Sequence, residues 1–180
     1  MKFLFDTNAI IPAEPTSQTE LEDATASVAE LLGLITRAEF QVYIHPVSVI
    51  EIEGDSNQER RTLRLKLLHK YQRLPAPPAI SNEFISAIGR PAAGSHSEKD
   101  AVILSALLRN AADFLVTDDN GIHRWATRLG VESRVLTISD ALATVRGLLP
   151  KQIEPPPAVE FAYCHELDIR DPIFDSLRGD

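Results

Sequence analysis

The chain has 180 residues and a formal net charge of −8, with 44% hydrophobic and 24% charged residues, which fits one folded domain and excludes a disordered chain. Its apolar runs are far shorter than the roughly 20 residues of a membrane span, and Asp6 interrupts the apolar start before it could form a signal peptide. The single cysteine, Cys164, excludes an internal disulfide and a cysteine zinc site, so we expect a cytoplasmic protein without a membrane segment.

The first third of the chain predicts a strand, a loop and a helix. Residues 2–6 form an apolar run typical of a buried strand, and the turn-forming residues after it, with Pro12, predict a loop. Thr19 and Glu22 match a capping box, and the apolar stripe behind them predicts a helix that reaches Ile35.

A second strand and a basic helix are expected next. Residues 41–45 predict the strand, and Pro46 suits the first position of a short helix. The stretch 59–73 is strongly basic, which predicts an RNA-binding face on an otherwise acidic chain. The alternative is a solvated helix face, with Leu63, Leu67, Tyr71 and Leu74 packed inward. The RNA-binding candidates are Arg60, Arg61, Arg64 and Lys66.

Strands and helices alternate through the remainder of the domain. Ser97 is expected to cap a nearly all-apolar helix that should be buried. The alternation predicts an α/β fold, a doubly wound, mostly parallel sheet with helices on both faces. The expected helices are 81–88, 100–111, 121–129 and 139–148, and the expected strands are 114–117 and 134–138. From residue 150 a proline-rich linker and an extended tail follow the domain 1–149.

Acidic residues stand where the predicted strands end. Asp6 ends the first strand, Glu51 lies in the helix after the second, Asp100 opens the buried helix, and Asp118 and Asp119 follow a later strand. Each has an ordinary role as a turn, cap or surface residue. Together they would meet at the carboxyl edge of a parallel sheet, where their repulsion calls for a cation. Hard oxygen ligands favour one or two Mg²⁺ or Mn²⁺ ions, which do phosphoryl chemistry.

The ordered set of acidic motifs resembles the PIN-domain nucleases over residues 1–149. This resemblance implies a doubly wound parallel sheet and metal-dependent endonuclease cleavage of RNA, commonly by the toxin of a bacterial toxin–antitoxin pair. It also implies an antitoxin partner and a homodimer. The motifs are Phe-Leu-Phe-Asp6-Thr7-Asn8, Pro46-Val-Ser-Val-Ile-Glu51, Asp100 before an apolar helix, and Leu115-Val-Thr117-Asp118-Asp119.

The resemblance also implies a role for each matched residue. Four acids would bind metal, and two polar side chains would steer the carboxylates or contact phosphate, unless they only stabilise turns. The acids are Asp6, Glu51, Asp100 and Asp119, with Asp118 as the substitute for Asp119, and the polar side chains are Asn8 and Thr117. The five histidines lack ligand spacing, so core or surface roles are expected. Trp125 is expected to pack in the core, with base stacking as the alternative.

The tail carries a second resemblance. Residues 167–180 look like the start of an acetyltransferase domain of the kind fused behind some bacterial PIN domains. The chain would then be a piece of a longer protein, with no acetyl-CoA site of its own.

Other readings of the acids remain. Haloacid-type phosphatases and receiver domains fit poorly, because the former needs Asp-x-Asp after the first strand and the latter a lysine after the last. A catalytically idle module that binds RNA or an antitoxin through the basic helix is the main alternative.

Overall fold

The computed structural model describes residues 1–150 together with residues 163, 166, 168, 170, 171 and 174. The chain divides into two compact units, Met1–Leu149 and Pro150–Asp180. Most of the predicted linker and of the acetyltransferase-like tail lies outside the described residues. In the described part of the chain, no helix has both the length and the apolar character of a membrane span.

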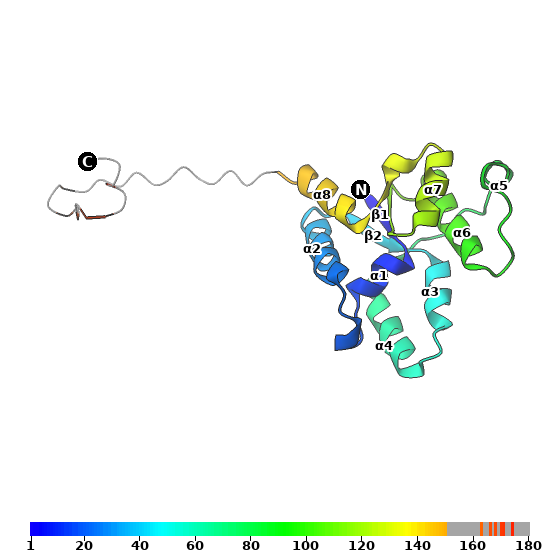
Figure 1. Cartoon of the computed structure of the whole chain (residues 1–180), viewed down its shortest axis with the longest axis horizontal. Coiled ribbons are helices and arrows are strands. Elements are labelled where there is room, and N and C mark those ends of the chain that lie inside the picture. Colours follow the sequence, from blue (N-terminus) through cyan, green and yellow to red (C-terminus); the bar gives the residue numbers. More distant parts are fainter. Residues whose placement is uncertain (151–162, 164–165, 167, 169, 172–173, 175–180) are drawn as a thin grey trace. The chain divides into compact units, whose positions relative to one another are not determined.

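A five-stranded parallel sheet forms the centre of the first unit (Figure 1). The strand order is β3-β2-β1-β4-β5, so β1 lies in the middle, with Phe5 paired to Ile44 on one side and Val116 on the other. Every strand pair is parallel, which confirms the predicted α/β class. The strands are β1 Lys2–Phe5, β2 Gln41–Ile44, β3 Gln72–Arg73, β4 Phe114–Val116 and β5 Val135–Leu136.

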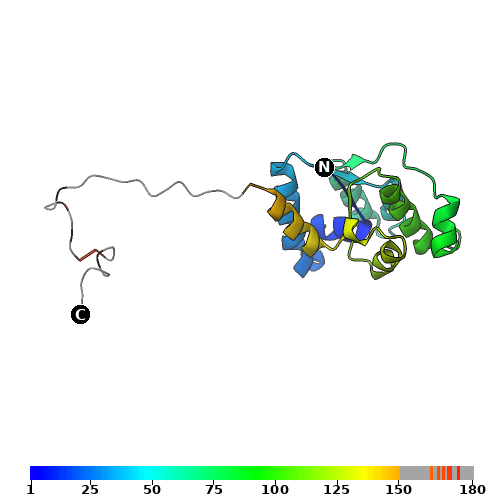
Figure 2. The same ribbon diagram turned by 90° about the horizontal axis from the view of Figure 1, so that it is seen from above.

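Helices cover both faces of this sheet, as the doubly wound fold requires. Figures 1 and 2 show α2 and α8 on one side and α5, α6 and α7 on the other. The α-helices are α1 Thr7–Ala13, α2 Asp23–Arg37, α3 Pro46–Glu53, α4 Gln58–Leu68, α5 Asn82–Ile88, α6 His96–Leu108, α7 Asn120–Arg128 and α8 Ile138–Leu148. Two short 3₁₀ helices, η1 Gln18–Glu20 and η2 Glu132–Arg134, complete the order.

Alternation along β1 separates two hydrophobic cores. Phe3 and Phe5 face the core formed with α1, α2 and α8, whereas Leu4 faces the core formed with α6 and α7. Successive side chains of a strand point to opposite faces, so one four-residue strand contributes to both layers. The predicted burial of the apolar helix is confirmed, because Leu104 and Leu107 of α6 have no exposed surface.

The predicted loop after the first strand is wrong, because residues 7–13 form helix α1. The Asp6 carboxylate accepts the backbone N–H of Thr7 and caps this helix, so a residue typical of turns here starts a helix instead. Pro12 lies one residue before the helix ends at Ala13. Burial of Ala9 and Ile10 holds the segment against the core.

Two predicted helix starts are also wrong. The capping box of α2 is formed by Glu22 and Thr25, and the chain before it is the short helix η1. Helix α6 begins at His96 with Ser95 as its cap, four residues earlier than predicted, so Asp100 lies one turn inside the helix. In both cases a second polar residue close by makes the hydrogen bonds of the cap.

The basic helix is shorter than the sequence indicates. Helix α4 ends at Leu68, and the two-residue strand β3 follows. Tyr71 and Leu74 are buried as predicted, but Leu63 is 41% exposed and does not pack inward. The Tyr71 hydroxyl donates a hydrogen bond to the buried Glu14 carboxylate, which fixes the chain where it leaves the helix.

Candidate active site

Asp6 is the most buried of the predicted site acids. It follows β1, the central strand, and its side chain is held by two hydrogen bonds. Oδ1 accepts the N–H of Thr7 at 2.7 Å, and Oδ2 accepts the hydroxyl of Thr117 at 2.9 Å. Because Thr117 follows β4, this second bond joins the ends of two neighbouring strands.

Thr117 organises the predicted polar groups around Asp6. Its Oγ1 lies 3.2 Å from Oδ1 of Asn8 and accepts the backbone N–H of Asp119 at 3.1 Å. Asn8 Oδ1 also accepts the N–H of Asp118 at 3.3 Å. The structure therefore places Asn8 and Thr117 between the two acidic segments, as hydrogen-bonding groups that orient them.

Asp119 is the N-cap of α7. Its Oδ1 accepts the N–H groups of Gly121 and Ile122 at 2.6 and 2.9 Å. A Cβ atom at Gly121 would lie 2.8 Å from this oxygen, so only glycine lets the carboxylate approach the helix so closely. Asp118 instead directs Oδ1 to the N–H of Ile138 at the start of α8, at 3.1 Å. The two candidates for the fourth acid thus have different partners.

Glu51 on α3 is joined to three neighbours. Its Oε2 accepts the hydroxyl of Thr7 at 2.8 Å, and its Oε1 lies 3.0 Å from Nδ1 of His96 and 3.4 Å from Nζ of Lys99. Thr7 thereby links Glu51 to Asp6, since the same residue donates its backbone N–H to Asp6.

Sequence reasoning gave no role to Thr7 or Lys99, and it predicted for His96 only the core or surface role expected of every histidine. One signal was available for His96, which is four residues before Asp100 and therefore shares a helix face with it. That signal was lost because the helix was predicted to begin at Asp100.

His45 fixes the start of the helix that carries Glu51. It follows β2, is buried, and accepts the N–H of Val47 at 3.1 Å through Nδ1. Burial lowers the pKa of His45 to about 4, so the imidazole is neutral at pH 7 and serves as a cap rather than as a cation. This agrees with the expected core role.

Asp100 is half-buried on α6 and has no hydrogen-bond or ion-pair partner among the residues that the structure describes. Its pKa is raised to about 6, mainly by burial and also by repulsion from Asp6, Asp119 and Glu51, against a smaller opposing effect of His96. The three acids that act on Asp100 come from three other segments of the chain. The four predicted acids are therefore close enough to influence one another.

The pKa of Asp6 shows the same coupling. This pKa is raised to about 6. Burial is the largest cause, the hydrogen bonds from Thr117 and Thr7 oppose it, and repulsion from Glu51 and Asp119 adds to it. For Glu51, burial acts to raise the pKa, but Thr7, Lys99 and His96 together lower it below its usual value. Asp119, and not Asp118, is among the largest causes of the raised pKa values of Asp6 and Asp100. We therefore define the electrostatic cluster as Asp6, Glu51, Asp100 and Asp119.

A cleft of about 560 Å³ opens beside this cluster, lined by Asn8, Asp100, Asp119 and Arg124 among others. Within the described residues, no three His, Cys, Asp or Glu side chains converge closely enough to hold one ion. The carboxylates are thus coupled through space without already forming a coordination shell.

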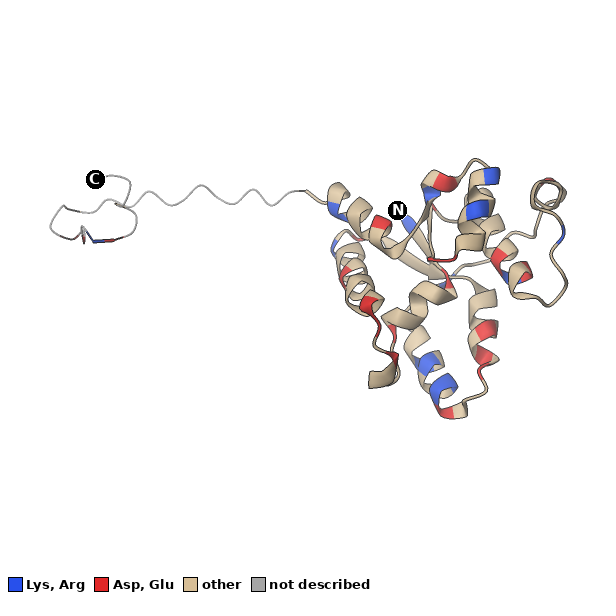
Figure 3. Ribbon diagram, viewed as in Figure 1, with Lys and Arg blue, Asp and Glu red and all other residues tan. Residues whose placement is uncertain are grey.

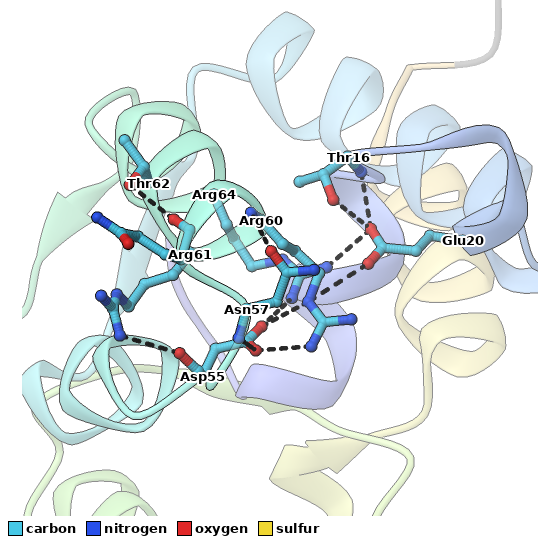
Figure 4. Close-up of polar contacts among 9 residues, drawn as sticks. Thr16, Glu20, Asp55, Asn57, Arg60, Arg61, Thr62 and Arg64 are labelled. Atoms are coloured by element: carbon cyan, nitrogen blue, oxygen red, sulfur yellow. Dashed lines mark hydrogen bonds and ion pairs between the residues drawn. The ribbon is translucent and has the colours of Figure 1, made fainter.

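The arginines predicted to bind RNA make hydrogen bonds or ion pairs with other residues of the chain (Figure 4). Arg60 makes two 2.6 Å hydrogen bonds to the Asp55 carboxylate, and Arg64, only 5% exposed, lies 2.9 Å from Glu20. Arg61 donates to the backbone oxygen of Asp55 at 3.0 Å. Figure 3 shows these basic positions on α4 beside the acidic positions of α3.

Of the four RNA-binding candidates, only Lys66 is exposed and without such a contact in the described part of the chain. RNA binding by the other three would require these intramolecular bonds to be exchanged, and it stays a prediction.

Neither protein-family models nor curated proteins give a match to this chain. The fold and the site define the class of protein by themselves. It is a doubly wound α/β domain with four coupled carboxylates at the carboxyl edge of its central strands.

Proposed function

We propose that the chain is a divalent-metal-dependent endoribonuclease of the PIN type. The observation that carries this proposal is the gathering of Asp6, Glu51, Asp100 and Asp119, from four separate segments, into one electrostatic cluster. Repelling carboxylates at a half-buried site cost stability, and a cation offsets that cost. The order and spacing of the same acids carry the resemblance to PIN domains.

The residues present fit a hard divalent cation such as Mg²⁺ or Mn²⁺. Asp100 is a half-buried carboxylate without a partner among the described residues, and Asp119 uses only Oδ1 in its cap, which leaves Oδ2 for a ligand. The ion or ions would be held by the four acids, and when bound would supply an activated water and charge neutralisation at phosphate.

The protein's own groups orient the acids. Thr7 and Thr117 hold the carboxylates of Glu51 and Asp6, and two backbone N–H groups of α7 hold Asp119. Such supporting hydrogen bonds fix the direction of the ligand oxygens, and losing them lowers metal affinity or activity. No side-chain nucleophile is needed, because water attacks the phosphodiester.

The biological setting is proposed from the resemblance alone. It suggests the toxin of a bacterial toxin–antitoxin pair, with an antitoxin and a second copy of the chain as partners, and a cytoplasmic location. A fused acetyltransferase domain beyond the tail belongs to the same proposal. A small neighbouring gene for a DNA-binding antitoxin would support it.

The test is manganese-dependent cleavage of single-stranded RNA by matched aspartate variants. Asp119→Asn and Asp6→Asn should each lower the cleavage rate by about 100-fold or more, because each removes a ligand charge but keeps the shape of the side chain. Asp118→Asn is the control, since its carboxylate contacts α8 and is outside the coupled set. Thermal unfolding of each variant verifies that the fold is intact.

Two results would count against the proposal. Cleavage that persists in Asp6→Asn would contradict the assignment of the four acids as metal ligands. Loss of activity in Asp118→Asn instead of Asp119→Asn would make Asp118 the fourth acid. A catalytically idle binding module would show no metal-dependent cleavage at all. The main support for such a module was the basic helix, whose Arg60 and Arg64 are in ion pairs.

A further inference from the structure

A second hollow lies next to the acidic cleft and shares part of its wall. Trp125 and Ser97 line both, and the second hollow, of about 320 Å³, is otherwise formed by the segment between α5 and α6. Its size is within the range of about 300–1,000 Å³ typical of small-ligand sites. The hollow is therefore adjacent to the cleft beside the carboxylates.

The charges around this second hollow differ from those of the cleft. Its lining includes Arg90 and no acidic residue, and Arg124 lines the neighbouring cleft. Both arginines are exposed, and in the described part of the chain neither is paired with an acid. The arginines of α4, in contrast, are in ion pairs. Two exposed cations that can meet phosphate thus lie at the acidic cleft and at the hollow beside it.

Trp125 separates the two hollows. It is half-buried, and part of its ring packs against the core that contains Ile122 and Ala126. The remaining surface lines the hollows on either side. A partly buried indole that also lines two hollows is a rigid aromatic surface on which a base can stack. The predicted packing of Trp125 against the core is confirmed, and base stacking, the alternative, stays a prediction.

We propose that the hollow between Arg90 and Trp125 binds a nucleotide of single-stranded RNA next to the scissile phosphate. This inference rests on the proposed nuclease function. The base stacks on Trp125, and Arg90 and Arg124 neutralise the adjacent phosphates. A base in a duplex is stacked on its own neighbours and cannot present its face, so the hollow selects single strands.

The experiment uses the single tryptophan of the chain as its own reporter. A short single-stranded RNA is titrated into the full-length protein in EDTA, and indole fluorescence is followed. Saturable quenching is expected with the single strand and none with the same RNA annealed to its complement. Absence of quenching by the single strand, or equal quenching by the duplex, would overturn the proposal.

Variants test base stacking and phosphate contact separately. The affinity of each variant for labelled RNA is measured by fluorescence anisotropy. Trp125→Ala should weaken binding about tenfold or more, and Trp125→Phe should retain most of the affinity. Arg90→Ala should lower the slope of log Kd against log salt by about 0.7, the value for one phosphate contact on a single strand. Arg128→Ala, on the same helix as Trp125 but outside both hollows, is the matched control. An equal effect of Arg128→Ala would refute the site.

The two proposals fail separately. Quenching without metal-dependent cleavage would overturn the nuclease and leave the nucleotide site, whereas cleavage without quenching would overturn the nucleotide site and leave the nuclease. If Trp125→Ala does not fold, because its ring also packs in the core, Trp125→Phe and Arg90→Ala still decide the outcome.

Discussion

Asp100 carries an unfavourable charge that its neighbours do not offset. Its carboxyl is half-buried, has no partner among the described residues, and has its pKa raised to about 6 by burial and by three other acids. The folded protein therefore binds this proton more tightly than the unfolded chain does. It follows that the ionised Asp100 lowers stability as pH rises from about 4 to above 6, and lowers it fully at neutral pH.

We predict that Asp100→Asn stabilises the metal-free protein. The full shift corresponds to about 3 kcal/mol, and solvent screening at a half-buried site reduces it to the order of 1 kcal/mol. In EDTA at pH 7.5 the Tm should rise by about 2–4 °C, and at pH 4 the difference should vanish. Thermal unfolding at the two pH values is the measurement.

We also expect Mn²⁺ to stabilise the wild type but not Asp100→Asn, because binding to the folded state raises Tm only where the ligands are present. A lower Tm for Asp100→Asn at pH 7.5, or a full response to Mn²⁺, would show that Asp100 is not part of a repelling metal-binding cluster.

At the scale of elements, the ion pairs of α4 connect segments that are distant in the sequence. Arg64 lies 2.9 Å from Glu20 of η1 and 3.7 Å from Asp55, which precedes α4 (Figure 4). The Arg64 side chain is 6% exposed, and its Nε has no partner in the described part of the chain. Removing one member of a buried pair leaves the others uncompensated.

We therefore predict that Arg64→Ala lowers the free energy of unfolding by about 3 kcal/mol, as measured by urea denaturation. Lys66→Ala, two residues along the same helix and exposed, should change it by less than about 0.5 kcal/mol. If Arg64 serves RNA binding instead, Arg64→Ala would reduce RNA affinity at unchanged stability.

The sequence correctly predicted the helices whose start depends on residues of the helix itself or next to it. Ser81 was correctly expected to open the short helix α5, and Pro46 to begin α3, because caps and proline act on their own helix. Strand β3 was missed because two residues, Gln72 and Arg73, carry no periodicity, and pairing with β2 alone makes them a strand. Helix α1 was missed because Asp6 suits a turn and a helix cap equally well.

The same difference between local patterns and long-range contacts applies to the candidate site. The rule that ligands meet the carboxyl ends of parallel strands brought Asp6 and Asp119 into consideration, and the structure couples them. The contact of Thr7 with Glu51 spans 44 residues and that of Lys99 with Glu51 spans 48. Contacts of this kind depend on how elements pack, and no pattern within one segment could reveal them.

At the scale of the whole molecule, both hydrophobic cores and all four acids lie within Met1–Leu149. Helix α8 closes this unit, because Ile138, Leu142 and Val145 pack into the first core. The first unit thus holds what a cooperative fold and the proposed chemistry require.

We predict that a chain of residues 1–149 unfolds in one cooperative transition, within about 1 kcal/mol of the full chain, or about 2–4 °C in Tm. It should also retain metal-dependent RNA cleavage. A chain of residues 1–136, which lacks α8 and its core residues, is the control and should not fold. Loss of cooperative unfolding in the 1–149 chain would show that the tail contributes to the fold.

The central position of β1 has a consequence for how the protein is made. Strand β1 precedes the other strands in the chain, but one of its two neighbours, β4, begins only at Phe114, and Asp6 donates its N–H to the carbonyl of Val116 there. A nascent chain up to that point carries Asp6 after a half-paired strand β1 and Glu51 on helix α3. The proposed catalytic centre lacks Asp119 until the segment after β4 has been synthesised, so a shorter chain should lack the proposed nuclease activity.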